Sequence, residues 1–128
     1  MDSIRWDGST LHLLDQRALP TRTEWLEIRT WEATAEAITD MVVRGAPAIA
    51  ITAAYGLVLA VKHNADRKQA SAMLRAARPT AVNLAWALDR LESIDDADLE
   101  DEAVAIHTED REICAAIGRH GAPLLTGG

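Results

Sequence analysis

Two short segments of the sequence place an arginine directly before the start of an expected helix, an arrangement that proteins use to hold phosphate groups. The first is Arg44-Gly45-Ala46-Pro47, and the second is Arg78-Pro79-Thr80. Arginine offers a planar fork of N–H donors, and the first turn of a helix leaves backbone amides unpaired at the positive end of the helix dipole. Because proline has no amide hydrogen, Gly45 and Ala46 would have to supply the backbone donors of the first segment.

The same two segments also fit a structural explanation that needs no ligand. Each is typical of an ordinary corner between two helices with a solvated arginine, and spacing alone favours this explanation over a phosphate site. The two corners could face one anion, but the spacing does not show that they do.

The first corner is expected to join two helices. Apolar and small side chains recur at spacings of three and four over about residues 31–43, which predicts a helix with Thr30 as its N-cap. Gly45 is expected to end this helix in the C-terminal glycine position, and Pro47 to lie in the first turn of the next helix. That second helix, up to about His63, is apolar on every side and should form the centre of the core.

Three further helices follow in this prediction. The residue before a proline disfavours the α region, so the third helix should end near Arg78, while Thr80 is available to cap the fourth. The fifth helix should end at Gly118 or Gly121. The predicted ranges of the last three helices are about 67–77, 80–93 and 99–117.

A small sheet is expected before the helices. The Asp7-Gly8 turn signal predicts a β-hairpin over residues 4–14, and residues 25–29 alternate again as a third strand would. The tryptophans are expected to pack this sheet onto the helices; they are Trp6, Trp25, Trp31 and Trp86. The predicted fold class is α+β, with a small N-terminal antiparallel β-sheet in residues 1–29 and a bundle of about five α-helices in residues 30–128.

The charge of the chain is distributed unevenly. The 128 residues carry a formal net charge of -7, which disfavours binding to nucleic acid or to an anionic membrane surface. Most of the acidic residues fall in residues 89–112, and we interpret that segment as a solvated helix face with its preceding loop. A calcium loop is excluded, because Asp95, Asp96 and Asp98 lack the glycine and the closing glutamate of such loops.

Other residues with reactive side chains do not form a recognisable site. The single cysteine, Cys114, cannot form an internal disulfide, and a single thiol indicates a reducing, cytoplasmic location. Its apolar neighbours predict a buried hydrophobic role. The histidines show no paired spacing, so surface or capping roles are expected for His12, His63, His107 and His120. No segment has the features of a secretory signal or a membrane span, since the most apolar run, residues 46–61, is too short.

Four segments in order strongly resemble methylthioribose-1-phosphate isomerases, which are relatives of the α, β and δ subunits of initiation factor 2B. These segments are Leu14-Asp15-Gln16-Arg17-Ala18-Leu19-Pro20, Met41-Val42-Val43-Arg44-Gly45-Ala46-Pro47-Ala48-Ile49, Ala53-Ala54-Tyr55-Gly56 and Arg78-Pro79-Thr80-Ala81-Val82-Asn83-Leu84. The chain departs from the family at Ala50, where a glycine is common, and at Ala77, which is often a serine. Neither departure affects the two arginines.

The resemblance implies a function and a set of site residues. Members of the family convert an aldose 1-phosphate into the corresponding ketose 1-phosphate in methionine salvage, without a metal or nucleotide cofactor. The positions that would bind the sugar phosphate are Arg44, Gly45, Ala46 and Arg78. The family's catalytic cysteine and aspartate lie in a second, Rossmann-like domain, so the resemblance implies no catalytic residue in this chain and an inactive N-terminal fragment. It also implies that the full-length form is a homodimer.

Three alternatives remain open at this point. The first is a ribose-1,5-bisphosphate isomerase of the same superfamily. The second is a regulatory or scaffolding module of the initiation factor 2B type, against which the presence of both phosphate arginines argues. The third is a truncated product with no role of its own, which would expose an apolar interface.

Overall fold

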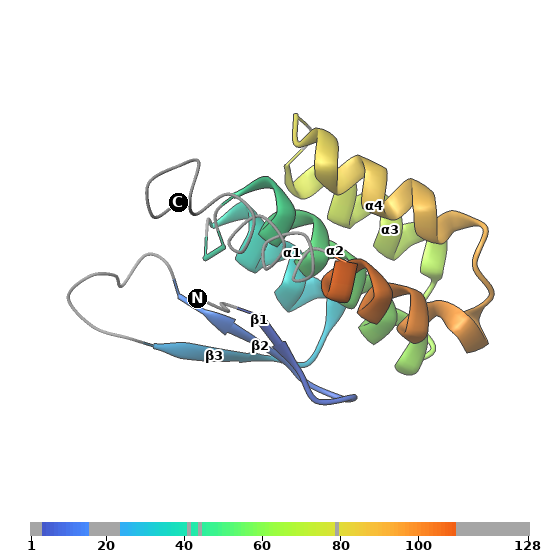
Figure 1. Ribbon diagram of the computed structural model, residues 1–128, viewed down its shortest axis with the longest axis horizontal. Helices are drawn as coiled ribbons and strands as arrows, with labels where there is room; N and C mark the ends of the chain where they lie inside the picture. Colours follow the sequence, from blue (N-terminus) through green and yellow to red (C-terminus); the bar gives the residue numbers. More distant parts are fainter. Residues whose placement is uncertain (1–3, 16–23, 41, 44, 79, 110–128) are drawn as a thin grey trace, which may run out of the picture.

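The computed structural model describes residues 4–15, 24–40, 42–43, 45–78 and 80–109. Its element order confirms the predicted α+β class, with an antiparallel sheet followed by helices (Figure 1). The strands are β1 (Ile4–Trp6), β2 (Leu11–Leu14) and β3 (Trp25–Ile28), and the helices are α1 (Trp31–Thr39), α2 (Ala46–Lys62), α3 (Arg67–Ala77) and α4 (Val82–Glu92). A further helix, called the final helix below, covers residues 96–109 of the described part.

The sheet is a meander in the order β1-β2-β3 with antiparallel pairing throughout. Ile4 pairs with Leu13, and Leu11 pairs with Ile28, and all four side chains are buried in the hydrophobic core. Paired residues in neighbouring strands point to the same face, so this register gives the sheet one apolar face. The predicted hairpin and third strand are therefore confirmed, and the sheet's apolar face packs on the helices.

Helix α2 is the centre of the core, as its all-round apolar sequence predicts. Every residue from Ile49 to Ala60 is buried. The sheet lies on one side of α2, and α3 and α4 lie on the other side (Figure 1). Within the described ranges, no helix is both long and apolar enough to cross a membrane.

The prediction for the end of the first helix was wrong. Helix α1 ends at Thr39, not near Val43, and the Val42 N–H donates to the Ala37 carbonyl at 3.0 Å, a bond typical of a Schellman ending. Val42 and Val43 are buried outside the helix, so the need to bury both valines ends α1 early. Gly45 is not the C-terminal glycine of α1 but the N-cap residue of α2, and Pro47 lies in the first turn of α2 as predicted.

Two other helix starts differ from the prediction. The N-cap of α4 is Ala81 rather than Thr80, so the threonine side chain does not cap this helix. The final helix begins at residue 96, three positions before the predicted start. The predictions for Cys114, Gly118, Gly121, His120 and the end of the final helix lie outside the described residues. By contrast, Thr30 caps α1 as predicted, since its Oγ1 accepts from the Ala33 N–H at 3.1 Å.

Gly56 lets α1 and α3 approach the middle of α2. A Cβ atom at this position would lie 2.7 Å from Thr34 Cγ2 and 3.1 Å from Leu74 Cδ2. We expect Gly56→Ala to lower the free energy of unfolding by about 2 kcal/mol, because overpacking a filled core forces side chains and backbone to shift. Urea denaturation followed by circular dichroism measures this change.

The double variant Thr34→Ser, Gly56→Ala is the matched control for that experiment. Serine keeps the hydroxyl that donates to the Thr30 carbonyl at 2.8 Å and removes the methyl group nearest to the added Cβ. The double variant should therefore recover part of the lost stability. A cost for Gly56→Ala that is unchanged in the Thr34→Ser background would contradict the assigned contact.

The hairpin turn makes a specific prediction about pH. Asp7 Oδ1 accepts from the Ser9 N–H at 2.9 Å and the Thr10 N–H at 2.7 Å, and these bonds, followed by that to His12, hold the pKa of Asp7 well below its ordinary value. A lowered pKa in the folded state stabilises the fold above the unfolded-state value of about 3.9, and this contribution is lost as the pH falls further. Asp7→Asn should reduce the loss of stability between about pH 5 and pH 2 in thermal unfolding. Asp101→Asn controls for the loss of one negative charge.

Candidate phosphate-binding corner

The two sequence-predicted corners lie at the same end of the helical bundle. A small pocket of about 170 Å³ is lined by residues from the first turns of α2 and α4 and from the end of the described part of the final helix; the lining residues are Pro47, Ala50, Ile51, Asn83, Trp86, Ile106 and Glu109. Pro47 and Asn83 therefore face a common space, which requires α2 and α4 to begin at the same end. The proximity of the two helix starts, left open by the spacing, is thus part of the fold.

The two helices that begin here differ from the others in how their N-termini are satisfied. The N-cap residues of α1 and α3, Thr30 and Asp66, accept hydrogen bonds from first-turn amides through their side chains. The N-cap residues of α2 and α4 are Gly45 and Ala81, and neither makes a side-chain capping bond. The first amides of a helix have no partner within the helix, so α2 and α4 present donors and positive dipole ends at this corner.

Of the four predicted phosphate-binding residues, the structure describes Gly45 and Arg78 fully. Gly45 is exposed, with φ +90° and ψ 137°, and its carbonyl accepts from the Ile49 N–H at 3.0 Å to start α2. Arg78 is half-buried directly after α3, and its φ of −143° and ψ of 78° lie outside the α region, as expected for a residue before a proline. Arg44 and the side chain of Ala46 lie outside the described residues, so the pairing of the two arginines remains a prediction.

Arg90 organises one wall of the pocket. Its guanidinium donates to both carboxylate oxygens of Glu109, at 3.0 and 2.6 Å, and lies 3.5 Å from a carboxylate oxygen of Glu102. It also lies over the ring of Trp86, 5.6 Å from the ring centre. Glu109 foremost, and Glu102 after it, raise the pKa of Arg90, and Arg90 in turn lowers the pKa of Glu109. The pair is therefore ionised at neutral pH and fixes the final helix against α4.

Trp86 was wrongly predicted as a residue that packs the sheet onto the helices. It is 51% exposed and lies on α4, where it lines the pocket. Trp6 does join the two layers, since its ring stacks on that of Tyr55 with ring centres 4.8 Å apart. The sequence does not show whether a tryptophan in a helix packs against the sheet or lines a pocket. For Trp86 this depends on how α4 packs on the final helix.

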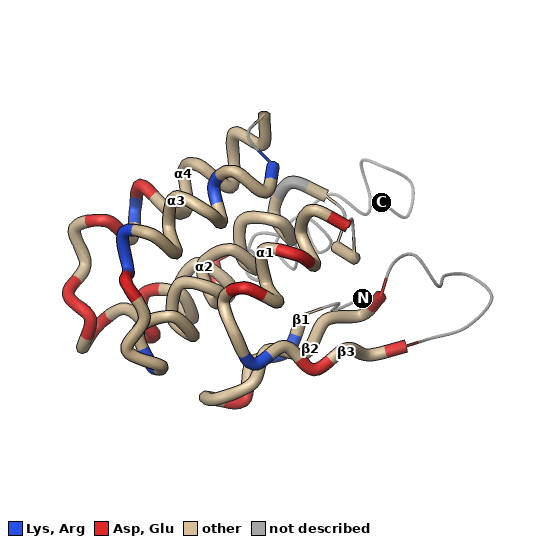
Figure 2. The backbone as a smooth tube through the Cα atoms, turned by 180° about the vertical axis from the view of Figure 1, so that it is seen from behind, with Lys and Arg blue, Asp and Glu red and all other residues tan. Residues whose placement is uncertain are grey.

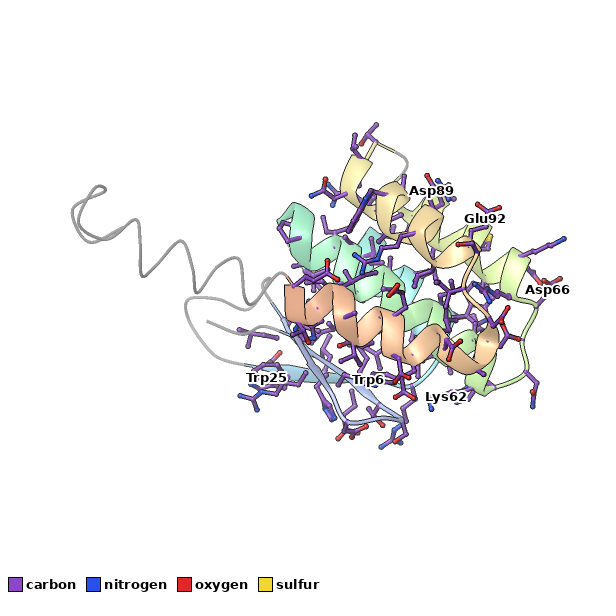
Figure 3. All side chains as sticks on the ribbon, turned by 45° about the vertical axis from the view of Figure 1, so that its right-hand side comes forward. Trp6, Trp25, Lys62, Asp66, Asp89 and Glu92 are labelled. Atoms are coloured by element: carbon purple, nitrogen blue, oxygen red, sulfur yellow. The ribbon has the colours of Figure 1, made fainter. Side chains whose placement is uncertain are left out.

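A polar cluster against the final helix, buried at Tyr55 and His107 and partly exposed elsewhere, was missed from the sequence. The Tyr55 hydroxyl and His107 Nδ1 are 2.7 Å apart, and His107 is buried rather than in the expected surface or capping position. Trp6 Nε1 donates to Glu100 at 2.7 Å, and Lys62 pairs with the other oxygen of Glu100 at 3.1 Å; Trp6 and Lys62 are labelled in Figure 3. The cluster attaches the sheet and α2 to the final helix. Sequence positions this far apart carry no pattern that predicts it.

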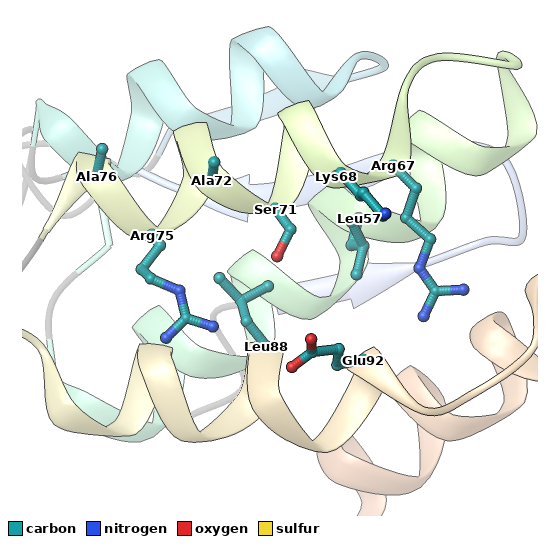
Figure 4. A pocket seen from close by; sticks show the side chains of 9 residues that line it. All are labelled: Leu57, Arg67, Lys68, Ser71, Ala72, Arg75, Ala76, Leu88 and Glu92. Atoms are coloured by element: carbon teal, nitrogen blue, oxygen red, sulfur yellow. The ribbon is translucent and has the colours of Figure 1, made fainter.

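A larger groove lies elsewhere, between α3 and α4. Figure 4 shows Arg67, Lys68 and Arg75 of α3 along one side and Glu92 of α4 on the other, and the groove has a volume of about 740 Å³. Arg67 is bound to Asp96 at 2.7 Å and to the Leu91 carbonyl, and Arg75 is bound to Asp89 at 2.7 Å. Both arginines therefore serve structural contacts, and neither of the two fully described phosphate-binding candidates, Gly45 and Arg78, lines this groove.

The acidic segment, residues 89–112, is largely exposed in its described part, as predicted, and about half of its described acids also pair with bases. Figure 2 shows acidic positions gathered where the chain passes from α4 to the final helix, next to basic positions at the start of α3. Asp89, Asp96, Glu100, Glu102 and Glu109 each pair with a base from α2, α3 or α4. In the part of the chain that the structure describes, no group of three or more His, Cys, Asp or Glu residues could hold a metal ion.

Comparison with known proteins identifies the family of the chain. The model of the initiation factor 2 subunit family matches residues 42–128, which include both corners. The chain belongs to the initiation factor 2 subunit family. It is 48% identical over 146 aligned residues to the methylthioribose-1-phosphate isomerase of Alkalilimnicola ehrlichii, covering 99% of this chain, and 45% identical over 133 residues to that of Parasynechococcus marenigrum, covering 98%.

Two solved structures share the fold. The 5-methylthioribose 1-phosphate isomerase from Pyrococcus horikoshii superposes with a TM-score of 0.88 at 33% identity, over 94% of this chain and 40% of that one. Subunit delta of the translation initiation factor eIF-2B from A. fulgidus gives a TM-score of 0.74 at 32% identity, over 97% of this chain and 42% of that one. The chain spans 42% and 40% of the lengths of the two isomerases that it matches in sequence.

The backbone of Gly45 gives a testable prediction for this corner. A residue with a side chain is strained at φ +90°, although nothing lies within 4 Å of the place of an added Cβ. We expect Gly45→Ala to lower the free energy of unfolding by about 1–3 kcal/mol in urea denaturation. Gly45→Ser should cost about as much as Gly45→Ala, because the strain comes from the backbone and the place of the added Cβ is open. An unchanged free energy of unfolding in Gly45→Ala would contradict a backbone origin.

Proposed function

We propose that this chain is the sugar-phosphate-binding part of a methylthioribose-1-phosphate isomerase. The observation that carries the proposal is the pair of helix starts, α2 and α4, that lie at one end of the bundle with no side-chain bond from either N-cap residue. The phosphate would accept from the amides of Gly45 and Ala46, with Arg44 and Arg78 on either side. The names of the most similar relatives support the choice of substrate.

The surroundings of the Arg78 side chain are compatible with binding an anionic substrate. Within the described part of the chain, its side chain makes no hydrogen bond or ion pair. A half-buried guanidinium without a protein acceptor is suited to an external one, since charge-assisted bonds to phosphate are among the stronger hydrogen bonds in proteins. The overall charge of -7 does not oppose this, because more than half of the acids fall in residues 89–112, and several of these pair with bases.

The chain's part in the reaction is binding and orientation. Isomerisation of an aldose 1-phosphate opens the sugar ring and moves hydrogen between C1 and C2, which needs a positioned acid or base and a site closed to water. We assign no such group to the described residues. In this proposal, the acid and the base belong to a second domain, since the relatives are more than twice as long as this chain. The 128-residue chain by itself should therefore form no ketose product.

The other parts of the proposal rest on the family and on composition. The longer protein is proposed to be a homodimer. It is also proposed to be cytoplasmic, because the cytosol keeps thiols reduced and this chain has a single cysteine. No metal and no nucleotide is required.

Isothermal titration calorimetry with methylthioribose 1-phosphate tests the binding proposal. The wild-type chain should bind, and Arg78→Ala should weaken binding by about tenfold or more, because a charged hydrogen bond is worth about 1.5–3 kcal/mol. Arg44→Ala should behave in the same way. Arg29→Ala is the matched control, since Arg29 is an exposed arginine paired with Glu27 outside the corner. Wild-type affinity in both corner variants would overturn the assignment.

A further inference from the structure

The groove between α3 and α4 has one basic wall and one acidic wall. The charged residues of α3 are all basic; they are Arg67, Lys68 and Arg75. On α4, Asp89 binds Arg75 across the groove and Glu92 lines it. The one base of α4, Arg90, instead binds two acids of the final helix. The two walls therefore carry opposite charge on the side that faces the groove.

Lys68 and Glu92 are the charges of these walls that no neighbour satisfies. Both are exposed, and among the described residues neither side chain takes part in a hydrogen bond or an ion pair. The two helices run in opposite directions, so the first turn of α3 lies beside the last turn of α4, and Figure 4 shows Lys68 and Glu92 at the same end of the groove. Each wall can thus offer one charge to a partner.

The space between the two charges is apolar and open to another helix. Leu57 and Leu88 form its floor, and Ala72 and Ala76 are exposed along the α3 wall. Small side chains at a helix surface allow a second helix to approach closely, because the distance between packed helices depends on the side chains at their contact. Covering an apolar floor of this kind removes it from water and is favourable.

We infer that two copies of this chain pack face to face through this groove, related by a two-fold axis that runs along it. Such an axis places α3 of each copy over α4 of the other and keeps matching ends together, so Lys68 of each copy pairs with Glu92 of the other. An axis across the groove would place α3 over α3 and set bases against bases, which is unfavourable. The charges of the two walls therefore select the first arrangement, and the contact needs no second domain.

The size of the two walls predicts a weak dimer. Helices α3 and α4 have 11 residues each, so together they present a face of about 16 Å by 20 Å. Stable interfaces usually bury about 800 Å² of each partner, which is more than such a face provides. We therefore expect a reversible dimer that dissociates on dilution.

Sedimentation equilibrium of the 128-residue chain, from about 5 µM to about 1 mM, tests the inference. The weight-average mass should rise with concentration from 13.9 kDa for the monomer toward twice that value. Lys68→Glu turns both symmetric pairs into pairs of acids, and Glu92→Lys turns both into pairs of bases. Each variant alone should raise the Kd of the dimer by about tenfold or more.

Mixing the two variants gives the decisive measurement. In an equimolar mixture of Lys68→Glu and Glu92→Lys chains, a heterodimer regains one acid and one base at both pairs, so dimers should form although neither variant dimerises well alone. The double variant Lys68→Glu, Glu92→Lys should dimerise by itself for the same reason. Both substitutions suit the helix dipole, since they place an acid in the first turn of α3 and a base at the end of α4, and the variants should therefore fold.

Glu32→Lys is the matched control, because it makes the same change of charge as Glu92→Lys at an exposed position on α1, away from the groove. It should leave the Kd unchanged. A chain that stays monomeric over the whole range would overturn the inference and leave the groove to a different partner. A dimer that is insensitive to both charge variants, or a mixture that does not associate, would overturn it as well. The groove contains neither Gly45 nor Arg78, so none of these outcomes affects the proposed function.

Discussion

The burial of α2 on every side is the constraint on which the rest of the structure depends. Twelve consecutive residues, Ile49 to Ala60, are buried, and a helix of about 3.6 residues per turn can be buried over that length only if neighbours cover all of its faces. The sheet, α1, α3 and α4 supply that cover. Gly56 has no side chain to separate α2 from Thr34 of α1 and Leu74 of α3, so the packing is close where three helices meet.

This constraint also locates the candidate site. The N-terminal end of α2 reaches the surface. Gly45 and Pro47 are exposed, whereas the residues from Ile49 to Ala60 are buried. Helix α4 packs along α2 and starts at the same end, so its first turn lies beside that of α2. The N-termini of α2 and α4 are therefore close together because α4 packs along α2 from the same end, and no further contact is needed to explain it.

The sequence predicts those parts of the fold that depend on local patterns. An apolar surface on all sides indicates the central helix, Thr30 indicates where α1 begins, and Asp7-Gly8 indicates the hairpin. The errors occur where distant residues decide the outcome. Gly45 looks like the end of one helix because the burial of Val42 and Val43, which ends α1 earlier, depends on tertiary packing. His107 and Tyr55 are 52 positions apart in the sequence, so their contact leaves no local sign.

The same difference between local patterns and contacts of distant residues explains which parts of the candidate site the sequence predicts. The arginines and the glycine at the two corners are recognisable because a helix start is a local feature. The pocket beside them is not, since it is made by three helices and depends on Arg90, which holds Trp86 and Glu109 in place from different parts of the chain. Acidic residues that look like a solvated surface in the sequence are engaged by Arg67, Arg75 and Arg90 instead. These pairs offset part of the charge of the acidic segment, whereas the Arg78 side chain pairs with none of the described residues. Both features favour the proposed anion site at the end of the bundle where α2 and α4 begin, although the chain as a whole is acidic.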